Sequence, residues 1–234
     1  MIRDIQNELM ALANPRKAVI LARFFKTGKG EYAEGDIFLG VMVPDTRRIA
    51  KKYATLSHHG IRRLLTSKYH EKRFVALLIM IEQFKKGDQE TKNRIYHTYL
   101  THTAYINNWD LVDLSAKHIV GAFLEPKPKN MLSILASSQN LWERRIAILA
   151  TFYYIDRGHY VDTLRIARML LDDKHDLIHT AVGWMLREVG KQCSQKILED
   201  FLKKRYKKMP CTMLRYAIER LPAARRNAYL RGMI

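Results

Sequence analysis

Cysteine is scarce in this sequence, with only Cys193 and Cys211 among 234 residues. Two cysteines are too few for a disulfide framework, and their spacing fits no metal-ligand motif. No stretch free of Asp, Glu, Lys and Arg reaches the roughly 18 residues of a membrane-spanning helix. The N-terminus is charged at Arg3 and Asp4 and has no apolar segment of signal-peptide length. We therefore expect a cytoplasmic protein that does not enter a membrane.

Acidic residues are also few, with 23 Asp and Glu against 41 Lys and Arg, which gives a net charge of +18. The hydrophobic content of 47% is ordinary and excludes a disordered chain. Residues 191–234 hold twelve of the basic residues and three acids, so half of the excess lies there. Clustered Lys and Arg release counterions from phosphates, and this charge favours a nucleic-acid partner. General solubility and weak attraction to a membrane surface are the alternatives.

Strand patterns are nearly missing, because most of the chain shows apolar residues at the three- and four-residue spacing of helices. Residues 70–86 and 142–156 are examples, and Gly and Pro fall between such runs. Residues 27–44 are the exception, since they hold four glycines together with the β-prone residues 37–39 and 41–43. The sequence predicts an all-α protein with an irregular loop at 27–44 that contains at most one short extended piece.

Similar helices recur along the chain. Arg73, Arg145 and Arg215 each precede an alanine closely, and they are separated by 72 and 70 residues. The midpoints of these intervals fall on Trp109 and Thr180, inside two further amphipathic segments. A period of about 35 residues is typical of paired-helix repeats, and no TPR consensus is present. We predict one domain over residues 1–234, a HEAT-like helical repeat solenoid in which antiparallel helix pairs form a curved superhelix. An irregular helical domain is the alternative.

The repeat brings certain polar and aromatic residues to equal helical phase. Trp109 and Asp113 are four residues apart and share one helix face, and Thr180 and Trp184 occupy the same two phases later in the chain. In the intervening repeat, Arg145 occupies the position that corresponds to Trp109 and Thr180. The sequence therefore predicts a concave groove that contains two tryptophans, a carboxylate and an arginine. Two further basic side chains follow Trp184 on the next turns, namely Arg187 and Lys191.

These residue types suit chemistry on DNA. Aromatic faces pack on sugars and bases, and an arginine binds phosphate through two hydrogen bonds. A carboxylate in such a groove repels phosphate, but it stabilises the positive charge that builds on a sugar when an N-glycosidic bond breaks. Both residue types also have a structural alternative. Arginines at the same position of successive repeats can tie those repeats together, which we favour for Arg73 and Arg215. Tryptophans at helical spacing can belong to the core, which we favour for Trp142.

Four segments of the chain resemble the DNA alkylation repair proteins of AlkD type, which are HEAT-like alkylpurine DNA glycosylases. They are Asn108-Trp-Asp-Leu-Val-Asp113, Leu141-Trp-Glu-Arg-Arg-Ile-Ala-Ile-Leu149, Ala181-Val-Gly-Trp-Met-Leu-Arg-Glu188 and Met213-Leu-Arg-Tyr-Ala-Ile-Glu219. The W-D-x-V-D and G-W-x-L-R-E pieces are specific when they occur together in this order. The resemblance covers nearly the whole chain.

The resemblance implies an enzyme that hydrolyses the glycosidic bond of N3- and N7-alkylated purines in duplex DNA without enclosing the base. It makes Asp113 the catalytic carboxylate, places Trp109 and Trp184 around the deoxyribose, and makes Arg145 a phosphate contact. Arg187 and Lys191 are weaker DNA-binding candidates. The cationic base needs no general acid, so no cofactor or metal is implied. A monomer is expected, associated with the nucleoid when it is bound to DNA.

The sequence departs from the family at one position and leaves two other functions open. Some members have a tyrosine near the lesion where this chain has Phe24, so the ring is kept as a DNA-binding candidate without its hydroxyl. A non-catalytic protein that binds damaged or branched DNA is the first alternative, and a protein-interaction scaffold is the second. His175 and His179 lie four residues apart but lack a third metal ligand, so we expect them to be structural or surface residues.

Overall fold

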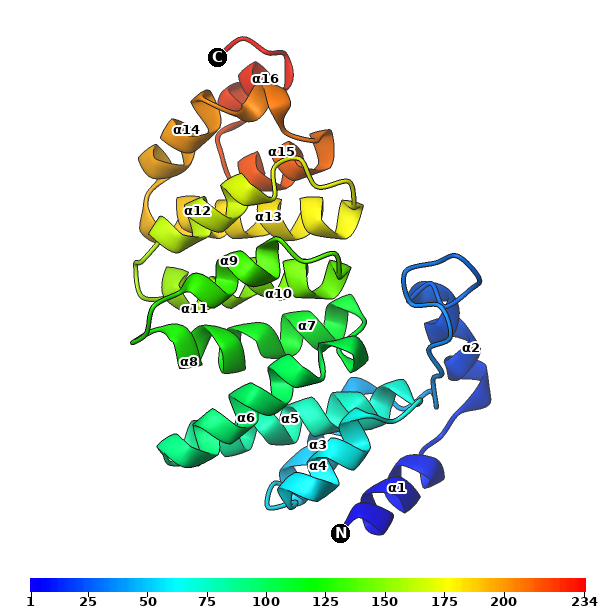
Figure 1. The fold of residues 1–234 in the computed structure, drawn as a ribbon. Coiled ribbons are helices and arrows are strands. Elements are labelled where there is room, and N and C mark those ends of the chain that lie inside the picture. Colours follow the sequence, from blue (N-terminus) through cyan, green and yellow to red (C-terminus); the bar gives the residue numbers. More distant parts are fainter. The chain divides into compact units, whose positions relative to one another are not determined.

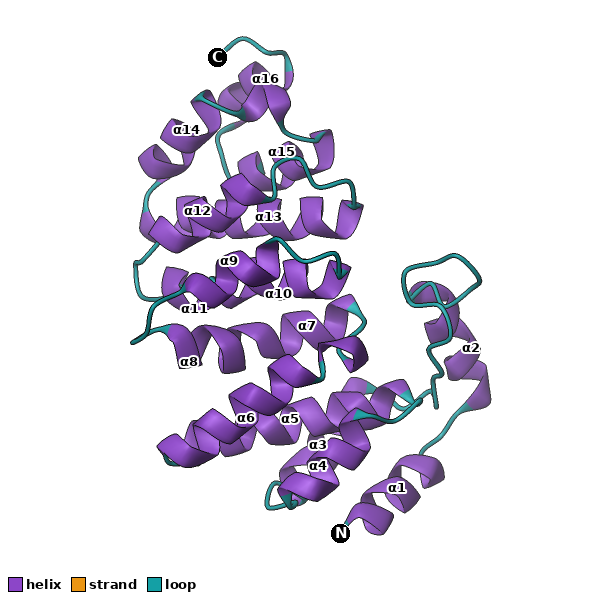
Figure 2. Cartoon of the chain, in the orientation of Figure 1, coloured by secondary structure: helices purple, strands orange, loops and turns teal.

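The computed structural model describes residues 1–234, and its regular structure is helical throughout (Figure 1; Figure 2). The one β-type contact is an isolated parallel bridge between Ile37 and Tyr69, and no strand is formed. The predicted all-α class is therefore confirmed. No helix is both long enough and apolar enough to cross a bilayer.

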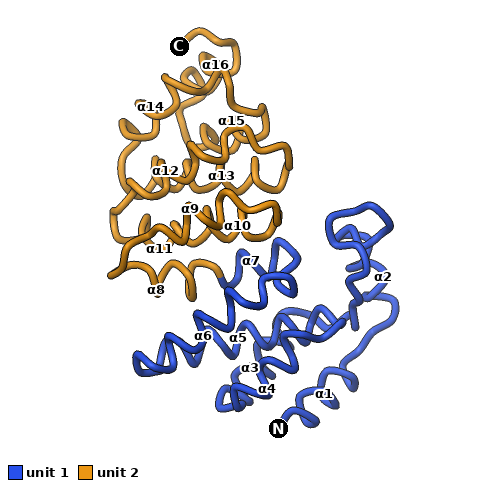
Figure 3. The backbone as a smooth tube through the Cα atoms, in the orientation of Figure 1, with its two compact units in different colours: residues 1–115 blue, residues 116–234 orange.

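The chain divides into two compact units, Met1–Ser115 and Ala116–Ile234, and the boundary falls within one helix (Figure 3). The single domain over residues 1–234 stays a prediction. The helical segments of the first unit are α1 (Ile2–Ala11), α2 (Pro15–Phe24), α3 (Val43–Lys52), α4 (His58–Leu65), α5 (His70–Lys86), α6 (Gln89–Thr101), the 3-10 turn η1 (Thr103–Tyr105) and α7 (Trp109–Ala116), which crosses the boundary.

Local capping sets several helix starts in the first unit. Asn14 accepts the backbone N–H of Lys17, and Pro15 supplies the fixed φ angle that suits the first turn of α2.

Helix α5 packs on α3, α4 and α6, and its residues 73–81 are all buried. The irregular loop predicted at 27–44 is present but ends at Met42, because Val43 and Pro44 already belong to α3.

The second unit stacks helix pairs in two layers. Its helical segments are the π-helix η2 (Lys117–Gly121), α8 (Ala122–Leu124), α9 (Asn130–Ala136), α10 (Leu141–Ala150), α11 (Phe152–Ile155), α12 (Val161–Met169), α13 (Asp176–Glu188), the π-helix η3 (Val189–Cys193), α14 (Gln195–Lys203), the 3-10 turn η4 (Tyr206–Lys208), α15 (Cys211–Ile218) and α16 (Ala223–Leu230). Helices α10, α13 and α15 pack side by side in one layer, and α9 and α12 pack in the other (Figure 1).

The predicted repeat matches the observed helices. The five recurring positions fall on five different helices, α5, α7, α10, α13 and α15, and bear Arg73, Trp109, Arg145, Thr180 and Arg215. Three of these helices, α5, α10 and α13, each pack on a preceding helix, namely α4, α9 and α12. Trp142 is buried, as predicted for a core residue. The helical-repeat class is confirmed, because the apolar spacing and the period together specify where each helix begins and which side it buries.

Two helical glycines let neighbouring helices touch through their backbones. A Cβ atom on Gly121 would lie 2.2 Å from the carbonyl oxygen of Ala150, and one on Gly183 would lie 2.5 Å from that of Met213. Real Cβ atoms do not approach oxygen so closely, so both contacts require glycine. Glycine in a helix costs about 1 kcal/mol relative to alanine, and here that cost permits close packing between consecutive repeats.

Some of the arginines at the recurring positions make contacts that hold the fold together. Arg73 binds Asp36 at 2.7 Å and donates to the carbonyl of Ser67, which confirms the expected tie. The neighbour of Arg145 makes an equivalent tie, since Arg144 binds Asp173 at 2.6 Å and the carbonyl of Ser138. Arg215 lies exposed on α15 and makes no ion pair or hydrogen bond through its side chain. The tie expected for Arg215 was therefore wrong.

Candidate functional site

An aromatic cluster surrounds the first residue of α7. The ring of Trp109 stacks on Phe25 with centroids 5.1 Å apart and meets Phe24 edge-on at 5.9 Å. Phe25 in turn stacks on Phe38 from the irregular loop at 5.1 Å. Phe24 is 62% exposed at the end of α2, which is high for a phenylalanine. The cluster therefore presents one solvent-facing ring, Phe24, beside the half-buried Trp109.

Asp113 lies one turn after Trp109 on α7 and is half-buried, so the two residues share a helix face as predicted. Both belong to the first unit. Arg145, Trp184, Arg187 and Lys191 belong to the second unit, and the groove predicted to unite all these residues stays a prediction.

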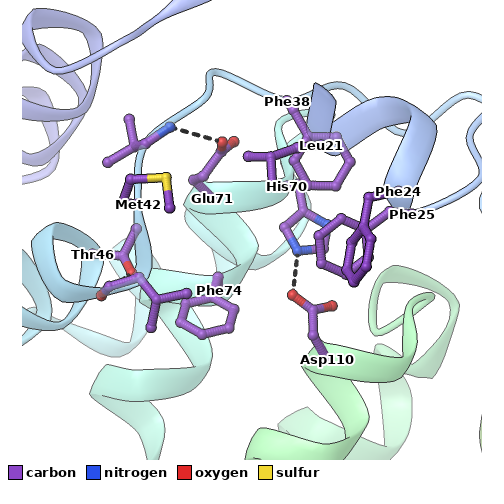
Figure 4. A pocket seen from close by; sticks show the side chains of 12 residues that line it. Leu21, Phe24, Phe25, Phe38, Met42, Thr46, His70, Glu71, Phe74 and Asp110 are labelled. Atoms are coloured by element: carbon purple, nitrogen blue, oxygen red, sulfur yellow. Dashed lines mark hydrogen bonds and ion pairs between the residues drawn. The ribbon is translucent and has the colours of Figure 1, made fainter. Parts of the chain in front are cut away.

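A charged histidine lies beneath the aromatic cluster (Figure 4). His70 Nδ1 is 2.8 Å from a carboxylate oxygen of Asp36, and its Nε2 is 2.8 Å from a carboxylate oxygen of Asp110. The imidazole also stacks on Phe38 at 4.4 Å and lies 5.3 Å from Phe25. Because both nitrogens face carboxylates, both donate hydrogen bonds when the ring is protonated.

The two carboxylates control the ionisation of this histidine. Burial opposes the charged form, but the charges and hydrogen bonds of Asp110 and Asp36 outweigh it and raise the pKa of His70 to about 9. The pKa of Asp36 is lowered, since the hydrogen bonds and charges of His70 and Arg73 outweigh the effect of its own burial. At neutral pH the cluster of Asp36, His70, Arg73 and Asp110 thus holds two positive and two negative charges.

This ionisation makes stability depend on pH. The pKa of His70 rises from 6.5 in the unfolded chain to about 9 in the folded one. Its contribution is therefore fully present below pH 6.5, falls by about 1.4 kcal/mol per pH unit above that value and is lost as the pH passes 9. We expect urea denaturation between pH 6.5 and 9 to show this slope in wild type relative to His70→Gln. Parallel curves for the two proteins would mean that His70 titrates normally.

The irregular loop is fixed to α5 by a second carboxylate. Glu71 is buried, and its side chain accepts the backbone N–H groups of Leu39, Gly40 and Val41 at 2.8–3.2 Å. Gly40 has φ +81°, and a Cβ atom there would lie 2.2 Å from the carbonyl oxygen of Asn14, so only glycine fits this turn.

A mostly apolar cavity of about 140 Å³ lies between the irregular loop and helices α2, α3, α5 and α7 (Figure 4). Its lining comprises Leu21, Phe24, Phe25, Phe38, Val41, Met42, Val43, Thr46, His70, Glu71, Phe74 and Asp110. The polar groups of His70, Glu71 and Asp110 are all engaged in the hydrogen bonds described above. The cavity therefore offers apolar contact more than polar recognition.

In the second unit, Arg145 is buried on α10 and donates a hydrogen bond to the carbonyl of Leu177 in α13. This contact ties two consecutive repeats, which is the structural alternative considered for arginines at this phase. Contact between Arg145 and a DNA phosphate stays a prediction.

Trp184 is half-buried on α13 and meets Phe152 edge-on at 5.7 Å. Phe152 in turn lies 4.0 Å from the Nζ of Lys117, a cation–π contact, and Lys117 pairs with Asp156 at 2.5 Å. The indole thus packs on an aromatic ring that itself carries a cation–π contact. Sequence reasoning predicted Trp184 but found neither Lys117 nor Phe152.

The two weaker DNA-binding candidates make ion pairs within the protein. Arg187 pairs with Glu219 and Glu188; burial opposes its charge, but the hydrogen bonds from these carboxylates outweigh it and raise the pKa of Arg187. Lys191 is exposed in η3 and lies 3.9 Å from Glu188. A phosphate would have to compete with these carboxylates for Arg187, whereas Lys191 is accessible. Their contact with DNA stays a prediction.

Four polar residues of the first unit were missed from the sequence: Asp36, His70, Glu71 and Asp110. Asp36 and Glu71 meet partners more than 30 positions away, and no local period shows such contacts. Asp110 lies next to Trp109, so proximity to the motif was the one available signal.

No group of three or more His, Cys, Asp or Glu side chains is arranged to hold a metal ion. His175 accepts the backbone N–H of Leu177 at the start of α13, and His179 Nε2 lies 2.6 Å from the carbonyl oxygen of Asp173. Both histidines are therefore structural, as expected.

Helices that recur about every 35 residues and stack in two layers define a HEAT-like helical repeat protein. Residues 5–221 match the family model described as DNA alkylation repair enzyme. This match spans nearly the whole chain, and the protein therefore belongs to the DNA alkylation repair enzyme family. No curated protein matches the sequence.

Two solved structures share the fold. One is described as a predicted DNA alkylation repair enzyme from Enterococcus faecalis; it is 17% identical, and the alignment covers 90% of this chain and 97% of that one with a TM-score of 0.69. The other is AlkD2 from Streptococcus mutans, which is 18% identical, with 89% and 99% covered and a TM-score of 0.54. At these identities the likeness supports the fold alone.

Proposed function

We propose that this protein is a monofunctional DNA glycosylase that excises positively charged N3- and N7-alkylated purines from duplex DNA. The observation that carries the proposal is the placement of Asp113 one turn after Trp109 on α7. The ring of Trp109 meets the exposed ring of Phe24. A half-buried carboxylate beside aromatic side chains suits a deoxyribose on which positive charge develops.

The proposed reaction breaks the bond between C1′ of the deoxyribose and the purine nitrogen. The bonding electron pair leaves with the base, which thereby loses its formal positive charge. Asp113 stabilises the sugar cation and orients a water molecule, which adds to C1′ and releases one proton. Trp109 and Trp184 hold the sugar, and no general acid is needed because the leaving base is neutral.

The net charge of +18 supports duplex DNA as the partner. A protein that only binds distorted DNA is the second candidate, and the basic surface alone would serve it equally well. Asp113 distinguishes the two, since a carboxylate near phosphate weakens binding and benefits only the reaction. We further propose that the enzyme acts as a monomer in the cytoplasm, on nucleoid DNA.

Base release from a duplex with a single N7-methylguanine tests the proposal. Abasic sites are converted to strand breaks by alkali and counted over time, with an unmodified duplex as the control. Breaks at the lesion alone are expected. If the protein binds the duplex but releases no base from it, the binding function is the better description.

The phosphate contact of Arg145 is tested by Arg145→Ala. We expect weaker binding to duplex DNA and a plot of log affinity against log salt whose slope is smaller by about one, because one counterion fewer is released. Arg144→Ala is the matched control, because it removes the equivalent tie to Asp173 and Ser138 at the neighbouring position and no predicted phosphate contact. If Arg145→Ala lowers the melting temperature and leaves the salt slope unchanged, Arg145 acts only as the tie to Leu177.

A further inference from the structure

The proposed reaction makes no use of the buried charges beside Trp109. The side chains of Asp36, His70 and Arg73 are 0%, 3% and 4% exposed, and that of Asp110 is 16% exposed. Burying charged groups is expensive even when they are paired, and apolar residues of similar volume would often stabilise a core as well. Such a cluster fixes one geometry, because every member has a directional partner.

The cluster connects three separate parts of the first unit. Asp36 belongs to the irregular loop, His70 and Arg73 begin α5, and Asp110 lies in the first turn of α7. Arg73 also donates to the side chain of Asn107 at 3.1 Å, two residues before Trp109. The start of α7 is therefore held on both sides of Trp109, by Arg73 before it and by His70 after it.

Ring contacts provide a second connection to the same tryptophan. The imidazole of His70 packs against Phe25 and Phe38 (Figure 4). Phe25 in turn stacks on Trp109. Movement of the imidazole would therefore reach Trp109 through Asp110 and through Phe25. Both connections depend on the one side chain of His70.

His70 also balances a charge close to Asp113. Asp110 and Asp113 are three residues apart on α7, so two carboxylates lie on neighbouring turns. The hydrogen bond from His70 at 2.8 Å compensates the negative charge of the Asp110 carboxylate. Without it, Asp110 would add a second negative charge where phosphates must approach.

From these contacts we propose that His70 is a positioning residue: held by Asp36, it fixes Asp110 and thereby the turn of α7 that carries Trp109 and leads to Asp113. The proposal rests on the proposed function, because the reaction gives this geometry its purpose. It concerns a residue that touches neither sugar nor base.

Two neutral replacements separate the bond to Asp110 from the bond to Asp36. A glutamine amide nitrogen reaches the position of Nε2, which faces Asp110, whereas an asparagine amide nitrogen reaches that of Nδ1, which faces Asp36. Both variants lose the same charge. In single-turnover excision of N7-methylguanine we expect His70→Asn to be about 10- to 100-fold slower than wild type and His70→Gln about 10-fold faster than His70→Asn. Affinity for undamaged duplex should change less than 3-fold in His70→Gln. Equal rates in His70→Asn and wild type would overturn the proposal.

A structural readout keeps the test independent of activity. The three tryptophans give three indole N–H signals in a nitrogen-15 NMR spectrum, and Trp109→Phe assigns one of them to Trp109. We expect His70→Asn to shift the Trp109 signal while the signals of Trp142 and Trp184 stay in place. An unmoved Trp109 signal in a folded variant would overturn the proposal even if wild type released no base.

If His70→Asn does not fold, Asp110→Asn replaces it, because Asp110 is the more exposed partner and the bond from His70 to Asp36 is retained. The Trp109 signal should again shift and excision should slow about 10-fold. A wild-type protein that releases no base contradicts the proposed function alone, whereas normal excision and an unmoved Trp109 signal in Asp110→Asn contradict the positioning role alone.

Discussion

Asp113→Asn is expected to bind alkylated duplex DNA as tightly as wild type and to release the base about 100- to 1,000-fold more slowly. Asparagine keeps the shape of the side chain and removes the negative charge that stabilises the sugar cation, and a loss of this size is typical for a preorganised electrostatic group. Binding should persist or strengthen, since the carboxylate repels phosphate. Single-turnover base release and a binding titration on the same N7-methylguanine duplex measure the two effects separately.

Asp200→Asn is the matched control, because it removes one negative charge from an exposed ion pair with Lys196. It should excise at the wild-type rate. Excision by Asp113→Asn at the rate of this control would show that Asp113 is not the catalytic carboxylate. The reaction would then have no assigned carboxylate.

Glu71→Ala is expected to unfold the irregular loop and to reduce the free energy of unfolding by about 3 kcal/mol or more. The substitution leaves three buried backbone N–H groups without an acceptor, and each unsatisfied group costs about 1–3 kcal/mol. Since the loop carries Asp36 and Phe38, the packing around Trp109 should also loosen. Urea denaturation measures the loss of stability, and limited proteolysis within residues 27–42 measures the release of the loop.

Glu31→Ala provides the comparison within the same loop. Glu31 accepts the backbone N–H of Gly28 at 2.8 Å, but it does so in an exposed turn where water replaces the lost acceptor. Its stability and its resistance to protease should stay near those of wild type. Equal effects of the two substitutions would indicate that any carboxylate in this region stabilises the loop and that burial of Glu71 contributes nothing special.

The fold was accessible from the sequence because its determinants are local and periodic. Apolar spacing marks each helix, and the interval of about 35 residues relates α5, α7, α10, α13 and α15. The irregular loop was also predictable from its glycines. The pattern could not provide the partner of each polar residue. Arg215 shows this, since its position in the repeat predicted a tie and its exposed side chain makes none.

The candidate site was likewise predictable from the sequence only in part. Trp109 and Asp113 share a helix face because they are four residues apart, and this could be predicted from spacing alone. His70, Asp36 and Asp110 meet across 34 and 40 residues of chain, and such contacts depend on how the loop folds back on α5. Arg145 could be singled out by its phase, but its hydrogen bond to Leu177 requires the packing of α10 on α13.

The backbone contacts at Gly121 and Gly183 have a mechanical consequence. Where helices touch through carbonyl oxygens, no flexible side chain lies between them to absorb a displacement, and close-packed interiors transmit strain. A shift of α13 by a bound duplex would therefore pass directly to α15 and the basic C-terminal residues beyond it. We therefore expect the helices joined by these two contacts to resist movement relative to one another, so that a bound partner would adapt its shape more than these helices do.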